Sequence, residues 1–228
     1  MLPTQNGSFR LFRFLGITVW LHWSWLLVAI FVLQSRQNYY SSLAWNVAEY
    51  LTLFAIVLMH EFGHSLACRQ VGGQADQIVM WPMGGVAYVS PPFRPGAQLW
   101  SIAAGPLVNV ALIPIFYFSA RLLILSGVAP TSPDFWDWFS TVQWINIILL
   151  CFNLLPVYPL DGGQIVRSLL WFGVGPRKSL LWASGFGLVG AAALGFWAFL
   201  QGSWWLGILV LFIASNGWRA FQAARRAG

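Results

Sequence analysis

Long apolar runs separated by short polar segments make up most of the chain. A helix needs about 20 predominantly apolar residues to cross a bilayer, and six runs reach or approach this length. These runs lie near residues 15–33, 44–68, 99–125, 138–157, 180–200 and 203–218. The pattern predicts an all-α polytopic membrane protein with six transmembrane helices, which we expect to form a single domain over residues 1–228.

The segment between the second and third runs has a different pattern. Residues 74–90, QADQIVMWPMGGVAYVS, contain two short stretches rich in β-forming residues, separated by Pro82 and two glycines. We therefore expect a small membrane-associated β hairpin or sheet between helices two and three. An open strand edge there could pair with an extended peptide by strand addition, although an ordinary interfacial loop is the alternative.

Composition supports the membrane assignment. Only 8% of the residues are charged and 58% are hydrophobic, so the chain cannot present an ordinary charged surface to water. The lipid bilayer is the expected surrounding. The net charge of +6 would suit nucleic acid, but the basic residues are spread among loops rather than gathered on one face. We expect no nucleic-acid partner.

The basic residues divide unequally between the two sides of a six-span arrangement. One side holds ten of them: Arg10, Arg13, Arg69, Arg94, Arg167, Arg177, Lys178, Arg219, Arg225 and Arg226. The other side holds only Arg36 and Arg121. Because cytoplasmic loops carry the positive excess, both the N and C termini are predicted to be cytoplasmic. The small size and lack of targeting signals favour a multi-pass protein of a prokaryotic plasma membrane.

Ionisable residues stand at the end of the second run, in MHEFGH at residues 59–64. Such residues are costly inside a membrane and indicate a functional site. On a helix, positions four apart lie about 40° apart around the axis and about 6 Å along it, so His60 and His64 can present nitrogens to one ion. In the H-E-x-x-H pattern the Glu is the general base of a metalloprotease. Glu61 would then take the proton of the water that the metal activates.

A catalytic zinc usually has three protein ligands, so one further donor is needed. The predicted topology brings Asp161, in NLLPVYPLDGG at residues 153–163, to the depth of the two histidines. It places the remaining acidic residues in loops or towards the other side. For His22, in WLHWSW, we favour an ordinary interfacial histidine bonded to backbone or water, and the alternative is a metal ligand or a group that hydrogen-bonds a ligand. We expect one zinc per chain, held by His60, His64 and Asp161.

With HEFGH in the second run and NLLPVYPLDGG closing the fourth, the chain resembles the site-2 protease family of intramembrane zinc metalloproteases. The second motif has the form N-x-x-P-x-x-x-L-D-G, with Asn153, Pro156, Leu160, Asp161 and Gly162. GPLVN at residues 105–109 is a further similarity. The resemblance implies zinc ligands at His60, His64 and Asp161, a general base at Glu61, and an Asn153 that holds the substrate or stabilises the oxyanion.

The resemblance also implies an activity. The family cleaves transmembrane protein substrates, commonly after a first cut by another protease, in regulated intramembrane proteolysis. We expect a zinc metalloendopeptidase that cuts near the cytoplasmic side, without a PDZ or CBS domain. From the residues alone, Asn153 and Asn109 could instead be ordinary hydrogen-bonding contacts between helices, and Asn109 could also support a metal ligand.

Two other functions are compatible with the pattern. A six-span transporter could bind a transported ion with the same residues, but the internal repeat that transporters often show is not detectable, and a transporter would have no need of Glu61. A catalytically silent relative could bind membrane-protein partners without cutting them. An activity assay separates both from a protease.

Overall fold

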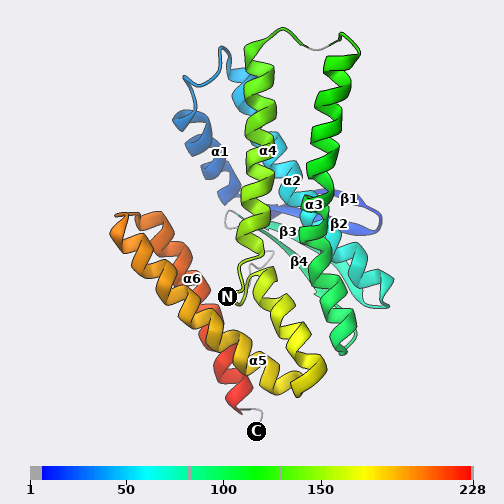
Figure 1. Cartoon of the computed structure of the whole chain (residues 1–228), viewed down its shortest axis with the longest axis vertical. Helices are drawn as coiled ribbons and strands as arrows, with labels where there is room; N and C mark the ends of the chain where they lie inside the picture. The colour runs from blue at the N-terminus through cyan, green and yellow to red at the C-terminus, as the bar shows by residue number, and fades with distance from the viewer. Residues whose placement is uncertain (1–6, 82–83, 129, 227–228) are drawn as a thin grey trace. The chain divides into compact units, whose positions relative to one another are not determined.

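The computed structural model describes residues 7–81, 84–128 and 130–226 (Figure 1). Contacts divide the chain into two compact units, Met1–Ser90 with Ala104–Leu150, and Pro91–Ala103 with Cys151–Gly228. Four of the described helices are long and apolar enough to cross a membrane: Leu43–Gln70, Pro95–Leu125, Asp161–Leu200 and Leu206–Arg226. The chain is therefore an integral membrane protein.

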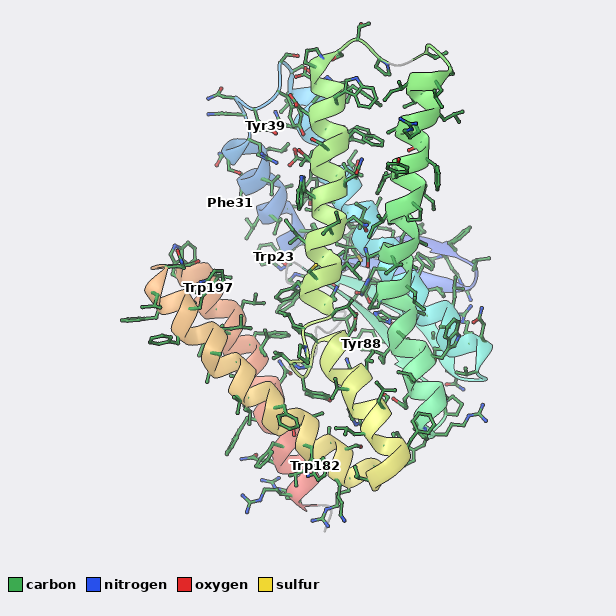
Figure 2. The ribbon with its side chains drawn as sticks, viewed as in Figure 1. Trp23, Phe31, Tyr39, Tyr88, Trp182 and Trp197 are labelled. Carbon is green, nitrogen blue, oxygen red and sulfur yellow. The ribbon has the colours of Figure 1, made fainter. Side chains whose placement is uncertain are left out.

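Large apolar side chains are exposed along these helices and along a shorter apolar helix, Ser24–Ser35. Figure 2 shows Phe31 on α1 (Ser24–Ser35) and Trp197 on α5 (Asp161–Leu200), and both are more than half exposed. An apolar surface of this kind would be an aggregation hazard in water. In a bilayer it is the surface that the lipid tails cover.

A four-stranded sheet is the centre of the first unit. The strands are β1 (Ser8–Phe14), β2 (Ile17–His22), β3 (Gln74–Trp81) and β4 (Gly84–Ser90), in the order β1-β2-β3-β4. β2 and β3 are parallel, and the other two pairs are antiparallel. The predicted hairpin over residues 74–90 is confirmed as β3 and β4, while Pro82 lies outside the described residues.

The predicted first span, residues 15–33, is wrong as a single helix. Its first part is β2, and the helix that follows, α1, has only 12 residues. A turn with Leu15 and Gly16 at positive φ precedes β2. Alternate residues Ile17 and Val19 are fully buried in the core of the first unit. A short apolar run fits a buried strand as well as a helix, and here the strand pairs with both neighbours.

The long helix α2 (Leu43–Gln70) packs on β3 and β4. Val57 on its buried face joins Ile78 and Met80 of β3 in the core. The helix ends at Gln70, where the N–H of Gly73 donates to the carbonyl of Cys68. The Arg69 guanidinium in its last turn donates to the carbonyls of Leu15 and Gly16, which ties the β1–β2 turn to the helix end.

A cluster of polar side chains lies near the first turns of α2. The buried Glu49 carboxylate pairs with Arg36 at 3.0 Å and accepts the Tyr40 hydroxyl at 2.6 Å. Burial raises the pKa of Tyr40, and the hydrogen bond to Glu49 raises it further, so this phenol stays a donor. A buried carboxylate is tolerated because both partners compensate it.

Two more helices continue the chain. α3 (Pro95–Leu125) begins in the second unit and continues into the first. α4 (Pro133–Asn153) belongs to the first unit up to Leu150, and its last residues belong to the second. α4 overlaps the predicted fourth span, residues 138–157, but ends at Asn153. Its N-terminal half is polar, and α4 is not among the four described helices that are apolar enough to cross a membrane.

The second unit is built on a helical hairpin. α5 and α6 (Trp204–Arg226) run side by side, joined at Gln201–Ser203 (Figure 1). Helices were predicted over 180–200 and 203–218, and both are confirmed. α5 also extends back to Asp161, with a break at Gly175, where φ is 81°, just before Pro176. Val157, Ala191 and Ile213 form the core of this unit.

Glycines hold the start of α5 against the loop that precedes it. A Cβ on Gly162 would come within 2.5 Å of the Leu155 carbonyl oxygen, and one on Gly163 within 2.7 Å of the Tyr158 Cα. These neighbours are backbone atoms that cannot rotate away. The two glycines therefore serve close packing here, and they set the position of Asp161 immediately before them.

We expect Gly163→Ala to destabilise this unit by about 1–3 kcal/mol, the usual cost of overpacking. Gly173→Ala, in the same helix, has no neighbour within 4 Å of the added Cβ and is expected to be neutral or stabilising by up to about 1 kcal/mol. Thermal unfolding of the purified protein in detergent measures both. Equal melting temperatures for the two variants would contradict the close packing at Gly163.

Candidate metal centre

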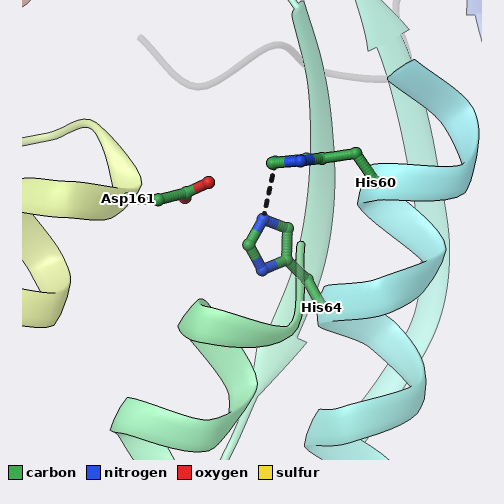
Figure 3. A group of neighbouring side chains, drawn as sticks. All are labelled: His60, His64 and Asp161. Atoms are coloured by element: carbon green, nitrogen blue, oxygen red, sulfur yellow. Dashed lines mark hydrogen bonds between the residues drawn. The ribbon is translucent and has the colours of Figure 1, made fainter. Parts of the chain in front are cut away.

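His60 and His64 lie one turn apart on α2 and are both buried. Their Nε2 atoms face each other at 3.1 Å (Figure 3). Two nitrogens bound to one tetrahedral zinc at about 2.05 Å would be about 3.3 Å apart. The spacing predicted from the sequence therefore gives a pair of nitrogens already close to the separation that one zinc ion requires.

Two glycines bring α3 close to this pair. A Cβ on Gly63 of α2 would lie 2.6 Å from the carbonyl oxygen of Ala104 on α3, so the two helices touch through backbone. A Cβ on Gly105 would lie 2.9 Å from the Nε2 of His60 and even closer to that of His64. Gly105 thus leaves open the space that the two imidazole nitrogens face.

Glu61 is held by the sheet. Its carboxylate is buried, and Oε2 accepts the backbone N–H of Ala87 in β4 at 2.9 Å. Gly85 passes so close that a Cβ there would lie 2.8 Å from Oε1. A hydrogen bond to a charged acceptor is stronger than one between neutral groups, so β4 orients the carboxylate beside the two histidines.

Asn109 on α3 contacts the other side of His60. Its Oδ1 lies 2.6 Å from the Nδ1 of His60, and its Nδ2 donates to the Oδ1 of Asn146 on α4 at 2.8 Å. Both asparagines are buried. The sequence indicated Asn109 as a possible partner of a ligand but missed Asn146, whose only signal is an amide in the middle of an apolar run.

His22 ends β2 and acts at the start of α1. Its Nδ1 accepts the backbone N–H of Ser24 at 3.3 Å and also contacts the Ser24 hydroxyl. In the described part of the chain it does not belong to a group of side chains that could hold a metal. The contacts of its Nδ1 are thus with Ser24, two residues further along the chain.

Asp161 and Asn153 belong to the second unit. Asp161 is the first residue of α5 and is partly buried, and Asn153 is the last residue of α4. A carboxylate in the first turn of a helix is favoured by the helix dipole. Figure 3 draws Asp161 with the two histidines. Two imidazole nitrogens and one carboxylate oxygen are a donor set of catalytic zinc, so the residue types fit this metal.

Known proteins resemble the chain over most of its length. The model of the family described as Peptidase family M50 matches residues 48–194. Zinc metalloprotease MJ0392 of Methanocaldococcus jannaschii is 33% identical over 80% of this chain and 51% of the relative. Putative zinc metalloprotease Rip3 of Mycobacterium tuberculosis is 32% identical over 97% of this chain and 58% of the relative. The chain thus spans between about half and three fifths of the length of these curated relatives.

A solved structure shows the same fold. The Site-2 Protease from Methanocaldococcus jannaschii superimposes with a TM-score of 0.65 and 27% identity, and the match covers 94% of this chain and 95% of that one. The relatives are named zinc metalloproteases, and the residue types of His60, His64 and Asp161 suit the same metal, so the cofactor is zinc. The family model, the relatives and the fold agree, and the chain belongs to peptidase family M50, the site-2 protease family.

Proposed function

We propose that the chain is a zinc metalloendopeptidase that hydrolyses a peptide bond of a transmembrane protein. The observation that carries this proposal is the buried pair of imidazole nitrogens 3.1 Å apart on α2, with the Glu61 carboxylate fixed beside them by β4. A transporter needs ion ligands, but it has no use for a carboxylate oriented next to them. Family membership points the same way.

His60, His64 and Asp161 would hold the zinc ion. The two histidines present Nε2, and Asp161 offers a carboxylate oxygen. A bound zinc acts as a Lewis acid on the scissile carbonyl and increases the acidity of water. Asp161 is supported by its residue type, by its place in the LDG motif and by the close packing of the glycines that follow it.

Glu61 would move protons between the water and the leaving group. Its carboxylate accepts a proton from the attacking water and delivers it to the departing amine, as a general base and then a general acid. The hydrogen bond from the Ala87 N–H to Oε2 holds the carboxylate in one orientation. Asn153 would donate its side-chain amide to the substrate or to the developing oxyanion, as the family motif suggests.

The sheet edge offers a way to hold an unwound substrate. A substrate helix must lose its own hydrogen bonds before a peptide bond is exposed, and β4 pairs only with β3 among the described strands. A substrate segment added along β4 would lie beside Glu61, because Ala87 of this strand already reaches that side chain. We propose that strand addition receives the substrate.

The setting of the reaction follows from the charge distribution. We propose that both termini are cytoplasmic, because ten of the twelve Lys and Arg residues fall on that side of the predicted six-span arrangement. Cleavage would then take place near the cytoplasmic side of a prokaryotic plasma membrane. A prior cut by another protease is part of the same proposal.

Glu61→Gln tests the activity. We expect the purified variant to bind about one zinc per chain, as the wild type does, and to lose cleavage of a model transmembrane substrate by a factor of about 10² or more, because an amide cannot accept the proton. Metal analysis and a gel-based cleavage assay measure the two properties. Cleavage by the variant at the wild-type rate would rule out Glu61 as the base, and zinc transport without cleavage would favour the transporter.

Gly105→Ala tests the metal position. The added Cβ fills the space in front of both Nε2 atoms. We therefore expect zinc affinity to fall by about 10–100-fold, as is typical of changes around a metal site. Gly96→Ala on the same helix adds a Cβ whose nearest atom is 3.8 Å away and should bind zinc normally. Equal zinc affinity in the two variants would place the metal elsewhere.

Disulfide mapping tests strand addition. In the inactive Glu61→Gln protein without the exposed Cys151, a cysteine replaces Tyr88 or Ala87, and single cysteines are scanned along the substrate. Strand pairing predicts crosslinks at every second substrate position, with the Tyr88 and Ala87 series displaced by one residue. Crosslinks at every third or fourth position would show that the substrate binds as a helix.

A further inference from the structure

The side chain of His60 has two nitrogens in different surroundings. Nε2 faces the Nε2 of His64, and Nδ1 faces the Oδ1 of Asn109 at 2.6 Å. A neutral imidazole carries its proton on one nitrogen only, and only the other nitrogen can bind a metal. The tautomer of His60 therefore decides whether Nε2 presents a lone pair or a hydrogen to the space that Gly105 leaves open.

The hydrogen bonds of Asn146 determine which group donates and which accepts between Asn146, Asn109 and His60. The side-chain nitrogen of Asn146 donates to the main-chain carbonyl oxygen of Asn109 at 2.9 Å. A carbonyl oxygen can only accept, so the amide of Asn146 has one allowed orientation. Its Oδ1 must then face Asn109, and it does so at 2.8 Å from Nδ2.

The orientation of the Asn109 amide in turn determines the position of the proton on His60. Because the Asn109 amide nitrogen is directed to Asn146, its Oδ1 is directed to His60. An amide oxygen accepts, so the Nδ1 of His60 must carry the proton. The opposite tautomer would place two acceptors 2.6 Å apart in a buried site, where a lost hydrogen bond costs about 1–3 kcal/mol.

We propose that Asn109 and Asn146 form a tautomer lock, a pair of positioning residues that keep the proton of His60 on Nδ1 and so keep Nε2 ready for the metal. The inference rests on the proposed zinc site. It names a function for two buried amides that otherwise would only join α3 to α4. A partner of this kind on the far nitrogen fixes the ring orientation and increases the basicity of a histidine ligand.

The GPLVN segment gains a physical explanation. Gly105 and Asn109 are four residues apart on α3, so they share one face of the helix. Gly105 opens the space on the Nε2 side of His60, and Asn109 binds the Nδ1 side. One turn of α3 thus contacts both edges of a single imidazole ring.

The lock is tested with Asn109→Leu and Asn109→Asp. Leucine removes the acceptor, and we expect zinc affinity, measured by chelator competition, to fall by about 10–100-fold. Aspartate loses the N–H that Asn109 donates to Asn146 but keeps an acceptor oxygen facing Nδ1, so it should lose less zinc affinity than leucine does. Asn46→Leu, which replaces another buried asparagine on α2, is the matched control and should bind zinc normally.

A second measurement reads the tautomer directly. NMR of ¹⁵N-histidine-labelled, metal-free protein above the titration range of histidine should show His60 protonated on Nδ1 in the wild type and a mixture of tautomers in Asn109→Leu. Protonation on Nε2 in the wild type, or unchanged zinc affinity in Asn109→Leu, would overturn the lock. The same loss of affinity in Asn46→Leu would also overturn it, because the effect would then be general destabilisation.

Neither readout depends on proteolysis. If no substrate is cleaved but the affinities and the tautomer follow the expected pattern, the lock stands and the proposed activity fails. If cleavage is found while Asn109→Leu keeps both its affinity and its tautomer, the activity stands and the lock fails.

Discussion

Two imidazoles with their Nε2 atoms 3.1 Å apart, buried in a largely apolar unit, are the constraint that shapes the first unit. Burial of polar nitrogens is costly unless each has a partner. The chain meets this requirement from α3, where Asn109 accepts from His60 and Gly105 keeps other atoms away from the two nitrogens. The surrounding helices are arranged so that polar groups face one another and apolar groups face outward.

The sheet has a defined role beside these histidines. Glu61 is held by a backbone N–H rather than by a side chain, so its orientation depends on the path of β4 and not on the identity of residue 87. That path is fixed in turn by the pairing of β4 with β3 and by the core between α2 and the sheet, against which Ala87 packs. The position of the proposed general base is thus a property of the fold.

Local patterns in the sequence predict a large part of this arrangement. The spacing of His60, Glu61 and His64 on a helix, and the β-forming stretches of residues 74–90, are short-range signals, and the structure contains both. The β1–β2 hairpin was missed because its apolar residues continue directly into α1, so one long run concealed a turn at Gly16. Asn146 was missed because it pairs with a residue 37 positions away, a contact that no local pattern encodes.

The contact of α3 with α2 also fixes the register of the two helices. A shift of α3 by one residue would turn its contact face by about 100° and would move both Gly105 and Asn109 away from His60. The glycine at position 63, whose surroundings include the backbone of Ala104, leaves little room for sliding either. Within the first unit, α2 and the adjoining turns of α3 should therefore move as one rigid body, and any opening that admits a substrate must be supplied by elements that do not share this contact.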